Sequence, residues 1–519
     1  MAVHPRYPLE PVMNAVPASH AIAEQPAFSG ALATFLKRKP RLLVNGEWAE
    51  PHGKGRVPVM DPATERQIAE VADADAEDVD RAVRAARAAF ESGPWPQMLP
   101  DERERLMWRL ADLLERHAEE LAELESLDNG KPIAMARLID VPGAIAQLRY
   151  MAGWASKIDG STFNTSLRAA PGTKFHTYTV REPVGVVAQI IPWNFPLLMA
   201  TLKLAPVLAT GCTTVLKPAE QTPLSALRLG ELILEAGFPP GVVNILTGLG
   251  ETTGAALVAH PGIDKIAFTG STEVGKIINI AATATLKRVS LELGGKSPVV
   301  VLPDVDPQAV APGAAMAVFF NSGQVCVAGS RLFVQRKIFD KVIEGVSEVS
   351  RSIVMGPGLD ARTQMGPLIS EEQRDRVLGY LQSGRKQGAT IVAGGDAPAH
   401  KGYYVKPTVI VDVKPDMKIV REEIFGPVVV AQRYDDLNEV AAWANDTPYG
   451  LAASIWSNDL RAVQRLVPKI KAGTVWVNCH AMIDAGMPFG GYKQSGFGRE
   501  QGRAGIEMYT ELKSVCMAI

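Results

Sequence analysis

The sequence has few cysteines, and no two of them lie close together along the chain. Its 519 residues contain four, Cys212, Cys326, Cys479 and Cys516, without a C-x-x-C motif. Four well-separated cysteines are too few for a disulfide framework, and their spacing does not suit a zinc site. We therefore expect free thiols, no bound metal and a reducing, cytoplasmic environment.

The sequence also lacks an excess of either charge and a long apolar run. Its formal net charge is −2, which gives no basic surface for nucleic acid. No apolar run reaches the roughly 18 residues of a membrane span. Residues 1–38 carry prolines and polar residues where a signal peptide needs a continuous apolar core. We expect a globular protein without nucleic-acid or membrane partners, preceded by an irregular N-terminal arm over 1–38.

The sequence does contain an alternation of predicted helices and strands. Residues 76–92 and 101–126 carry apolar residues at helical spacing. From residue 184 onward, helical stretches separate short β-branched runs: VGVVAQII (184–191), TTVLK (213–217), GVVNIL (241–246) and KIAF (265–268). This order predicts an α/β fold with a parallel sheet, which binds ligands at the carboxyl ends of its strands.

Capping residues predict where two of these helices end. Asn129-Gly130-Lys131-Pro132 supplies the stop signal of the helix over 101–126. In the helix that follows residue 217, Thr222 is the expected N-cap, Pro223 the first helical residue and Gly237 the end.

A second series of strands and helices follows Cys326. RLFVQ, TVIVDV, AASIWS and TVWVN are predicted strands, while EEQRDRVLGYLQSG and DDLNEVAAWAND are predicted helices. The series predicts a second domain of similar layering, with Cys326 near the seam between the two. We expect the last residues, CMAI, to belong to a final buried strand.

Three stretches at predicted strand ends are candidates for a dinucleotide site. Gly248-Leu249-Gly250 and Gly254 have a spacing one residue longer than the dinucleotide fingerprint. FTGSTEVG (268–275) opens a helix whose N–H groups could meet a phosphate, although a simple tight turn explains this stretch equally well. Lys217 and Glu220 could bind a ribose, and the carboxylate would favour NAD over NADP. The alternative is a solvated ion pair.

Three side chains are candidates for the chemistry. Asn194 in IIPWNFP could hold a developing oxyanion, although loop asparagines often only form turns. Glu292 in LELGGKSP suits a general base, unless it faces solvent on an edge strand. Cys326 in FFNSGQVCVAGSR is either a nucleophile or a packed core thiol. We expect the other three cysteines to be core thiols.

Together, these stretches resemble the NAD(P)-dependent aldehyde dehydrogenase superfamily. FFNSGQVCVAGSR, LELGGKSP, IIPWNFP, LKPAEQTP, FTGSTEVG, EEIFGPV and PFGGYKQSGFGRE occur in that family's order and spacing, and the resemblance runs from LLVNGEW (42–48) to the end. It implies a Rossmann-like NAD-binding domain over 39–160 and 184–293. It also implies a catalytic domain over 294–495 and a β oligomerisation arm over 161–183 and 496–519, in a homotetramer or homodimer.

The resemblance also implies roles for individual residues. Cys326 matches the nucleophile, Asn194 the oxyanion-hole amide beside the Cys326 backbone N–H, and Glu292 the base that activates water. The positions that match the NAD site are Ile191, Pro192, Trp193, Lys217, Glu220, Gly250, Phe268, Gly270, Ser271, Leu293, Glu423 and Phe425. Those that match the aldehyde tunnel are Phe195, Met199, Leu202, Val325, Val327, His480, Ile483 and Phe489.

These tunnel positions are mainly apolar and include no arginine for a substrate carboxylate. The stretches FLKRKPRLLVNGEW and NCHAMIDAGMPFGG are similar to bacterial phenylacetaldehyde dehydrogenases. We therefore expect a hydrophobic or aromatic aldehyde such as phenylacetaldehyde. The alternatives are a long aliphatic, terpenoid or betaine aldehyde, a coenzyme A-acylating enzyme, against which Glu292 argues, and a non-catalytic binding protein.

Overall fold

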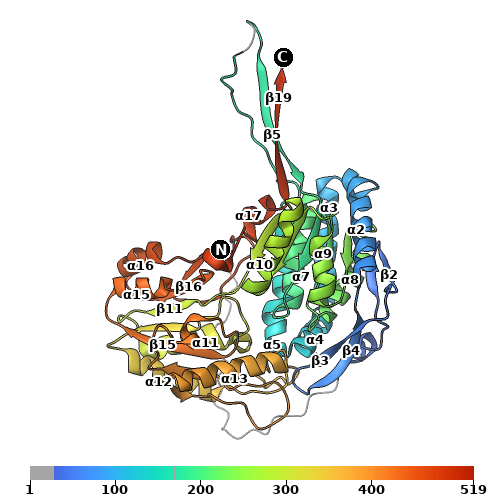
Figure 1. Ribbon diagram of the computed structural model, residues 1–519. Helices are drawn as coiled ribbons and strands as arrows, with labels where there is room; N and C mark the ends of the chain where they lie inside the picture. The colour runs from blue at the N-terminus through green and yellow to red at the C-terminus, as the bar shows by residue number, and fades with distance from the viewer. Residues whose placement is uncertain (1–27, 169–170) are drawn as a thin grey trace, which may run out of the picture.

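Two sheets built mainly of parallel strands form the body of the protein (Figure 1). The computed structural model describes residues 28–168 and 171–519. In the first sheet the parallel strands are flanked by antiparallel strands at both edges. Its order is β18 (Gly496–Phe497), β10 (Arg288–Glu292), β9 (Lys265–Thr269), β6 (Val186–Ile190), β7 (Thr213–Lys217), β8 (Val243–Ile245), β1 (Leu42–Val44) and β2 (Glu47–Ala49).

The second sheet has seven strands, and β13 alone among them runs antiparallel to its neighbour. Its order is β13 (Thr390–Ala393), β14 (Thr408–Val411), β15 (Val428–Tyr434), β12 (Arg331–Gln335), β11 (Pro298–Val301), β16 (Ala452–Trp456) and β17 (Thr474–Val477). The central strands of both sheets are buried on both faces, as their continuous apolar runs predict. The α/β prediction is confirmed.

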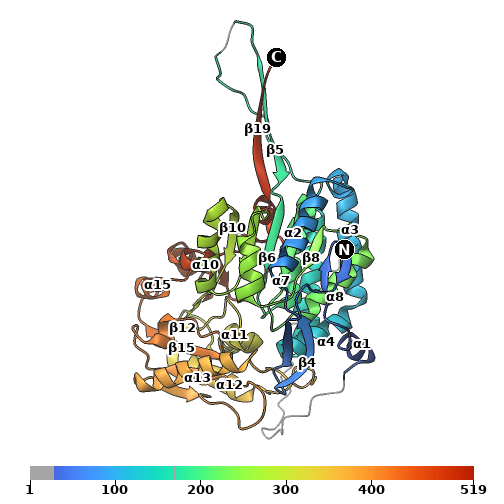
Figure 2. The ribbon, with the colours of Figure 1, turned by 45° about the vertical axis from the view of Figure 1, so that its right-hand side comes forward.

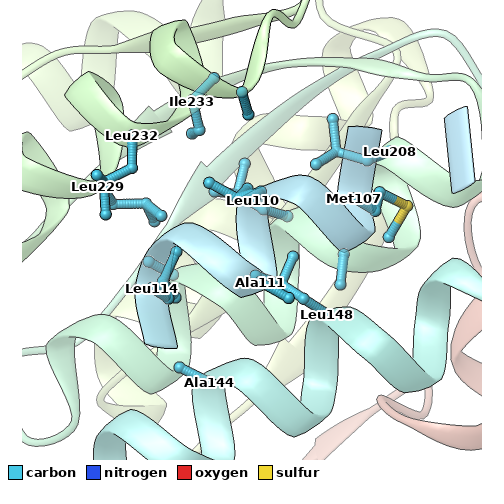
Figure 3. Close-up of a cluster of buried hydrophobic side chains, with 14 of the residues drawn as sticks. Met107, Leu110, Ala111, Leu114, Ala144, Leu148, Leu208, Leu229, Leu232 and Ile233 are labelled. Atoms are coloured by element: carbon cyan, nitrogen blue, oxygen red, sulfur yellow. The ribbon is translucent and has the colours of Figure 1, made fainter. Parts of the chain in front are cut away.

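Helices cover the sheets, and four of them build the apolar core shown in Figure 3: α3 (Pro100–Arg116), α6 (Val141–Ala152), α7 (Pro196–Thr210) and α8 (Leu224–Ala236). Met107, Leu110 and Leu114 recur at helical spacing on α3 and meet Leu148 of α6 and Leu229 of α8. Burial of each such leucine contributes roughly 1.5–3 kcal/mol. This core fixes α7, whose first turn carries part of the candidate site.

The remaining elements complete the layers. The other α-helices of the described ranges are α1 (Gly30–Phe35), α2 (Ala76–Glu91), α4 (Ala118–Asn129), α5 (Ile133–Met135), α9 (Ala255–Ala259), α10 (Thr272–Ala282), α11 (Pro307–Phe319), α12 (Phe339–Ser352), α13 (Glu371–Lys386), α14 (Lys418–Arg421), α15 (Leu437–Asn445), α16 (Leu460–Leu466) and α17 (Gly502–Glu507). Strands β3 (Arg56–Asp61) and β4 (Arg66–Ala72) form a separate hairpin. None of the helices in this part of the chain is both long and apolar enough to cross a bilayer.

Two helix boundaries differ from the prediction. The helix expected over 101–126 is interrupted at His117, whose imidazole Nδ1 lies 3.1 Å from Glu120 Oε2, so that α3 and α4 are separate helices. Helix α8 begins at Leu224 rather than at Pro223, because Asp128 Oδ2 accepts the Leu224 N–H at 3.1 Å in place of the expected Thr222 cap. Its end at Gly237 is as predicted.

A two-stranded ribbon projects from this body (Figure 2). Strand β5 (Phe175–Pro183) pairs antiparallel with the C-terminal strand β19 (Thr510–Ala518). The prediction that the last strand is buried is wrong, because most of β19 is exposed on this unsupported ribbon. Cys516 is therefore exposed rather than a core thiol, whereas Cys212 is buried and Cys479 is intermediate.

The predicted irregular N-terminal arm lies partly outside the described residues, which begin at residue 28. Within the described part, Gly30–Phe35 forms helix α1, with Ser29 Oγ accepting the Leu32 N–H at 3.2 Å. The apolar side chains of Leu32 and Phe35 pack against Leu124 of α4. This apolar contact makes the end of the arm helical rather than irregular.

Candidate active site

Asn194 lies in the loop between β6 and α7, at the carboxyl end of a central parallel strand. Its side chain is buried, and Nδ2 donates to the backbone oxygen of Gln324 at 2.9 Å. Gln324 precedes Cys326 by two residues, so this hydrogen bond joins the Asn194 loop to the loop of the candidate nucleophile. An amide nitrogen has two hydrogens, so the other hydrogen can still be donated to a ligand.

The loop before Cys326 holds an unusual backbone conformation. Asn321 and Ser322 have φ of 47° and 56°, in the left-handed region that non-glycine residues rarely adopt. The Asn321 side-chain Nδ2 donates to the Asn194 oxygen at 3.1 Å, and Ser322 Oγ donates to the Gly366 oxygen at 2.9 Å. These bonds hold a conformation that costs energy on its own, a pattern that clusters at functional sites.

Cys326 is enclosed by apolar side chains. Phe195, Val325, Val327 and Phe489 belong to one buried cluster, against which Cys326 packs. Burial raises the pKa of the Cys326 thiol to about 12, with further contributions from the carboxyls of Glu423 and Glu292. In this environment the thiol stays protonated at neutral pH, so its proton must pass to a nearby base or to solvent before the sulfur can attack.

Glu292 is the last residue of β10, and its carboxyl is buried. Strand β10 lies between β9 and β18, so the alternative of a solvent-facing glutamate on an edge strand is wrong. Its Oε2 has no hydrogen-bond partner within the described residues. Burial, followed by the charge of Glu500, raises its pKa well above the usual range, while Lys203 and Arg499 lower it. A buried carboxyl with a raised pKa and an unoccupied oxygen is suited to proton transfer.

Lys203 and Glu500 form a buried ion pair that our sequence reasoning missed. Lys203 lies on α7, and the Lys203 backbone oxygen accepts from Gln189 Nε2 at 2.5 Å. The two partners are 297 residues apart along the chain, beyond the reach of local spacing. The sequence offers one signal, a single lysine inside the apolar run LLMATLKLAPVL, because a buried lysine needs a partner.

Glu423 is a second carboxyl near Cys326; it is partly buried, and a backbone N–H holds it in place. Its Oε1 accepts the Gly295 N–H at 2.9 Å, and a Cβ at Gly294 would lie 2.2 Å from its Oε2. Burial raises its pKa to about 7. Two residues further along, the Phe425 ring meets the Trp193 ring edge-on, with centroids 5.3 Å apart. The predicted cofactor residues on these two loops therefore lie together.

The other predicted cofactor residues lie at the carboxyl ends of β6, β7, β9 and β10. Ile191, Pro192 and Trp193 follow β6, Phe268 and Gly270 lie at the end of β9, and Leu293 follows β10. Lys217 ends β7, is buried, and places Nζ 3.3 Å from Glu220 Oε2. Ser271 caps α10, its Oγ accepting the Val274 N–H at 3.2 Å.

These residues suit a dinucleotide. The N-terminus of α10 offers N–H groups and a positive dipole end to phosphates, and Glu220 and Glu423 offer acceptors for ribose hydroxyls. Gly250 begins a short π-helix (Gly250–Gly254), and a Cβ at Gly254 would lie 3.6 Å from Lys217 Cδ. The G-L-G-E-T-T-G stretch therefore borders Lys217 rather than forming a strand-to-helix fingerprint turn.

The predicted tunnel residues separate into two groups. Phe195, Met199, Val325, Val327 and Phe489 pack with Cys326. Leu202 and Ile483 are not part of this cluster, whereas the His480 ring packs against Trp476 of the cluster, with ring centroids 5.0 Å apart.

Each of these three has different surroundings. Leu202 is buried on α7, and the Ile483 side chain is 47% exposed. His480 is partly buried, with its ring Nε2 2.8 Å from the Val327 oxygen and its Nδ1 3.1 Å from Ser454 Oγ. Burial lowers its pKa to about 4, so the ring is neutral at physiological pH. These contacts make His480 a support of the cysteine loop.

Comparisons with known proteins show which family the chain resembles. The aldehyde dehydrogenase family model matches residues 48–515. The chain is 51% identical to phenylacetaldehyde dehydrogenase of Pseudomonas fluorescens over 485 residues, 93% of this chain and 97% of that protein. It is 49% identical to mitochondrial aldehyde dehydrogenase of Rattus norvegicus over 481 residues, 92% of each chain. The NAD+ complex of aldehyde dehydrogenase from Bacillus cereus matches with a TM-score of 0.93 at 48% identity, covering 96% of this chain and 100% of that one.

Proposed function

The chain belongs to the aldehyde dehydrogenase family, and we propose that it oxidises an apolar aldehyde, of the phenylacetaldehyde type, to a carboxylic acid with NAD. The observation that carries this proposal is the arrangement of three groups: a partly buried thiol, a buried amide tied to the thiol's loop, and a buried carboxyl with one oxygen that has no hydrogen-bond partner among the described residues. Thiol, amide and carboxyl supply the nucleophile, the oxyanion donor and the base of acyl transfer.

The first step is addition of Cys326 to the aldehyde. Sγ forms a bond to the carbonyl carbon while Glu292 accepts the thiol proton. The negative charge that develops on the carbonyl oxygen is held by Asn194 Nδ2 and the Cys326 backbone N–H, because preorganised donors in a buried site stabilise such charge strongly. The product of this step is a thiohemiacetal on Cys326.

NAD, when bound, supplies the acceptor for the hydride that leaves the substrate carbon. Lys217 and Glu220 would hold its adenosine ribose, the N-terminus of α10 its pyrophosphate, and Glu423 its nicotinamide ribose. The structure of the Bacillus cereus relative with NAD+ supports this choice of cofactor. Loss of the hydride leaves a thioester on Cys326.

Glu292 then acts a second time. The proton taken from Cys326 passes to solvent before this step, so the carboxylate can accept a proton from the water that attacks the thioester carbon. The C–S bond then breaks to release the carboxylic acid, and the proton held by Glu292 passes to the Cys326 sulfur to regenerate the thiol. This role requires an ionised carboxyl with a free oxygen, which fits the partner-free Oε2 of Glu292. It also argues against transfer of the acyl group to coenzyme A, since a water-activating base would destroy that thioester.

The apolar walls of the cluster around Cys326 support an apolar substrate. The 51% identity to phenylacetaldehyde dehydrogenase of Pseudomonas fluorescens supports phenylacetaldehyde among the apolar aldehydes. The projecting β5–β19 ribbon supports the prediction of a homodimer or homotetramer, which analytical ultracentrifugation would check.

The test is NADH formation by the purified protein with NAD and a panel of phenylacetaldehyde, aliphatic, terpenoid and betaine aldehydes. We expect the highest kcat/KM for phenylacetaldehyde and no activity in Cys326→Ala. Activity that persists in Cys326→Ala would overturn the mechanism. A preference for betaine aldehyde, or a dependence on added coenzyme A, would overturn the proposed substrate or product.

A further inference from the structure

A short segment at the end of α4 holds the loop that carries Asn194. Asn129 Nδ2 donates to the Trp193 oxygen at 2.8 Å, and Lys131 Nζ donates to the Asn194 oxygen at 3.0 Å. The same ammonium lies 4.4 Å from the centroid of the Phe195 ring. Three successive residues of the loop are therefore held from one short segment, whose sequence predicts only the end of a helix.

Lys131 is buried, and its ammonium group lies between the carboxyls of Asp140 and Glu125. Its Nζ forms an ion pair with Asp140 and lies 3.8 Å from Glu125 Oε2. Glu125 in turn accepts the Leu197 N–H through Oε1 at 2.8 Å, which fixes the first turn of α7. A buried ion pair is often no more stabilising than apolar residues of the same volume. Stability alone therefore does not explain why a charged pair occupies this position.

The same segment is connected to the loop that carries Cys326 through the backbone around Gly358 and Gly366. Ile133 N–H donates to the Gly358 oxygen at 2.8 Å, and a Cβ at Gly366 would lie 2.0 Å from the Gly130 oxygen. Gly366 also accepts the hydroxyl of Ser322 in the Cys326 loop. One stretch of backbone around Gly366 thus contacts both the segment that holds Asn194 and the loop that carries Cys326.

We propose that Lys131 is a positioning residue of the oxyanion hole: its ammonium group, held by Asp140, fixes the backbone of Asn194 so that the side-chain amide stays aimed at the substrate oxygen. This inference rests on the proposed function of Asn194 and Cys326. Lys131 touches no reacting atom; it acts through the Asn194 oxygen, which also accepts from Asn321 of the opposite loop.

The test uses Lys131→Met in the full-length enzyme, which keeps the side-chain length and removes the charge. Two rates are measured: kcat/KM for phenylacetaldehyde with NAD, and inactivation by iodoacetamide, which alkylates Cys326 without forming an oxyanion. We expect kcat/KM to fall about 10- to 100-fold, the range expected for a displaced oxyanion donor. The alkylation rate should stay within about twofold, because the nucleophile itself is untouched.

A double mutant separates positioning from general damage. Asn194→Ala alone should lower kcat/KM about 100-fold or more. In that background Lys131→Met should cost less than about threefold, since residues that act through one another are not additive. The matched control is Arg228→Met, which removes a partly buried cation. Its guanidinium pairs with Glu120 at 3.0 Å and, among the described residues, donates no hydrogen bond to the Asn194 loop, so kcat/KM should stay unchanged.

Three results would overturn the inference: unchanged kcat/KM in Lys131→Met, an equal fall of the alkylation rate, or a full additional loss in the Asn194→Ala background. If Lys131→Met does not fold, Asp140→Asn, which removes the charge of one of the two carboxyls beside the ammonium, is read by the same criteria. A wild-type protein without aldehyde-dependent NADH formation would instead show that the proposed function fails.

Discussion

Glu292, which is buried, and Glu423, which is partly buried, place two carboxyls near the same thiol, and the two differ in how they are held. The charge of each raises the pKa of Cys326. Glu423 is fastened by the Gly295 N–H, whereas Oε2 of Glu292 has no hydrogen-bond partner in the part of the chain described. A fastened carboxyl is suited to hold a ligand in place, and a free one to exchange protons.

The difference follows from the positions of the two residues in the fold. Glu292 ends a strand of the first sheet, where Gly490 leaves room beside it, since a Cβ there would lie 2.9 Å from Oε1. Glu423 lies in the loop before β15 of the second sheet and reaches back to the glycines after Glu292. The glycine pair Gly294-Gly295 therefore admits the Glu423 carboxyl as well as ending the strand.

Glu292→Gln should give the largest effect. Steady-state NADH formation should fall about 100- to 10,000-fold, because no other base is placed to activate water. The first turnover should slow much less, since the thiol proton can still pass to solvent. Stopped-flow absorbance would show one NADH per active site followed by near arrest. Equal slowing of the first and later turnovers would remove the distinction between the two carboxyls.

Glu423→Gln should give a smaller and different effect. The amide can still accept the Gly295 N–H but binds ribose hydroxyls more weakly than a carboxylate does, so kcat/KM for NAD should fall about tenfold. Steady-state and single-turnover rates should fall together. A burst like that of Glu292→Gln would show that Glu423, and not Glu292, serves hydrolysis.

Glu500→Gln tests what sets the pKa of Glu292. The Glu500 charge raises that pKa and Lys203 lowers it, so the variant should lower the pKa of Glu292. Because the base acts in its ionised form, the acid limb of the kcat–pH profile should move to lower pH. An acid limb that stays in place or moves to higher pH would contradict this electrostatic account.

Glu220→Ala should give the smallest effect. This carboxylate is 30% exposed, and interactions at exposed charges are weak, so we expect at most about a fivefold loss of preference for NAD over NADP. Steady-state kcat/KM for both cofactors measures the preference. A fall in kcat/KM with NAD as large as that of Glu292→Gln would contradict the expectation that buried carboxylates matter more to activity than exposed ones.

Much of the site was predictable because its residues lie in short stretches at strand ends. Strand β7 covers the predicted residues 213–217, and Cys326, Asn194 and Glu292 each lie within three residues of a glycine or proline. The Lys203–Glu500 pair was not predictable, since its members are 297 residues apart. For Lys131 the sequence predicts only a place in a helix stop signal, because its contact with the Asn194 backbone oxygen forms only in the folded chain.

The central claim is that Glu292 hydrolyses an acyl group carried by Cys326. Mass spectrometry of Glu292→Gln after incubation with NAD and phenylacetaldehyde tests it most directly, with Cys326→Ala as the control. The account predicts a phenylacetyl group on the peptide that contains Cys326, and none in the control. An unmodified Cys326 peptide in Glu292→Gln, despite formation of one NADH per active site, would contradict it.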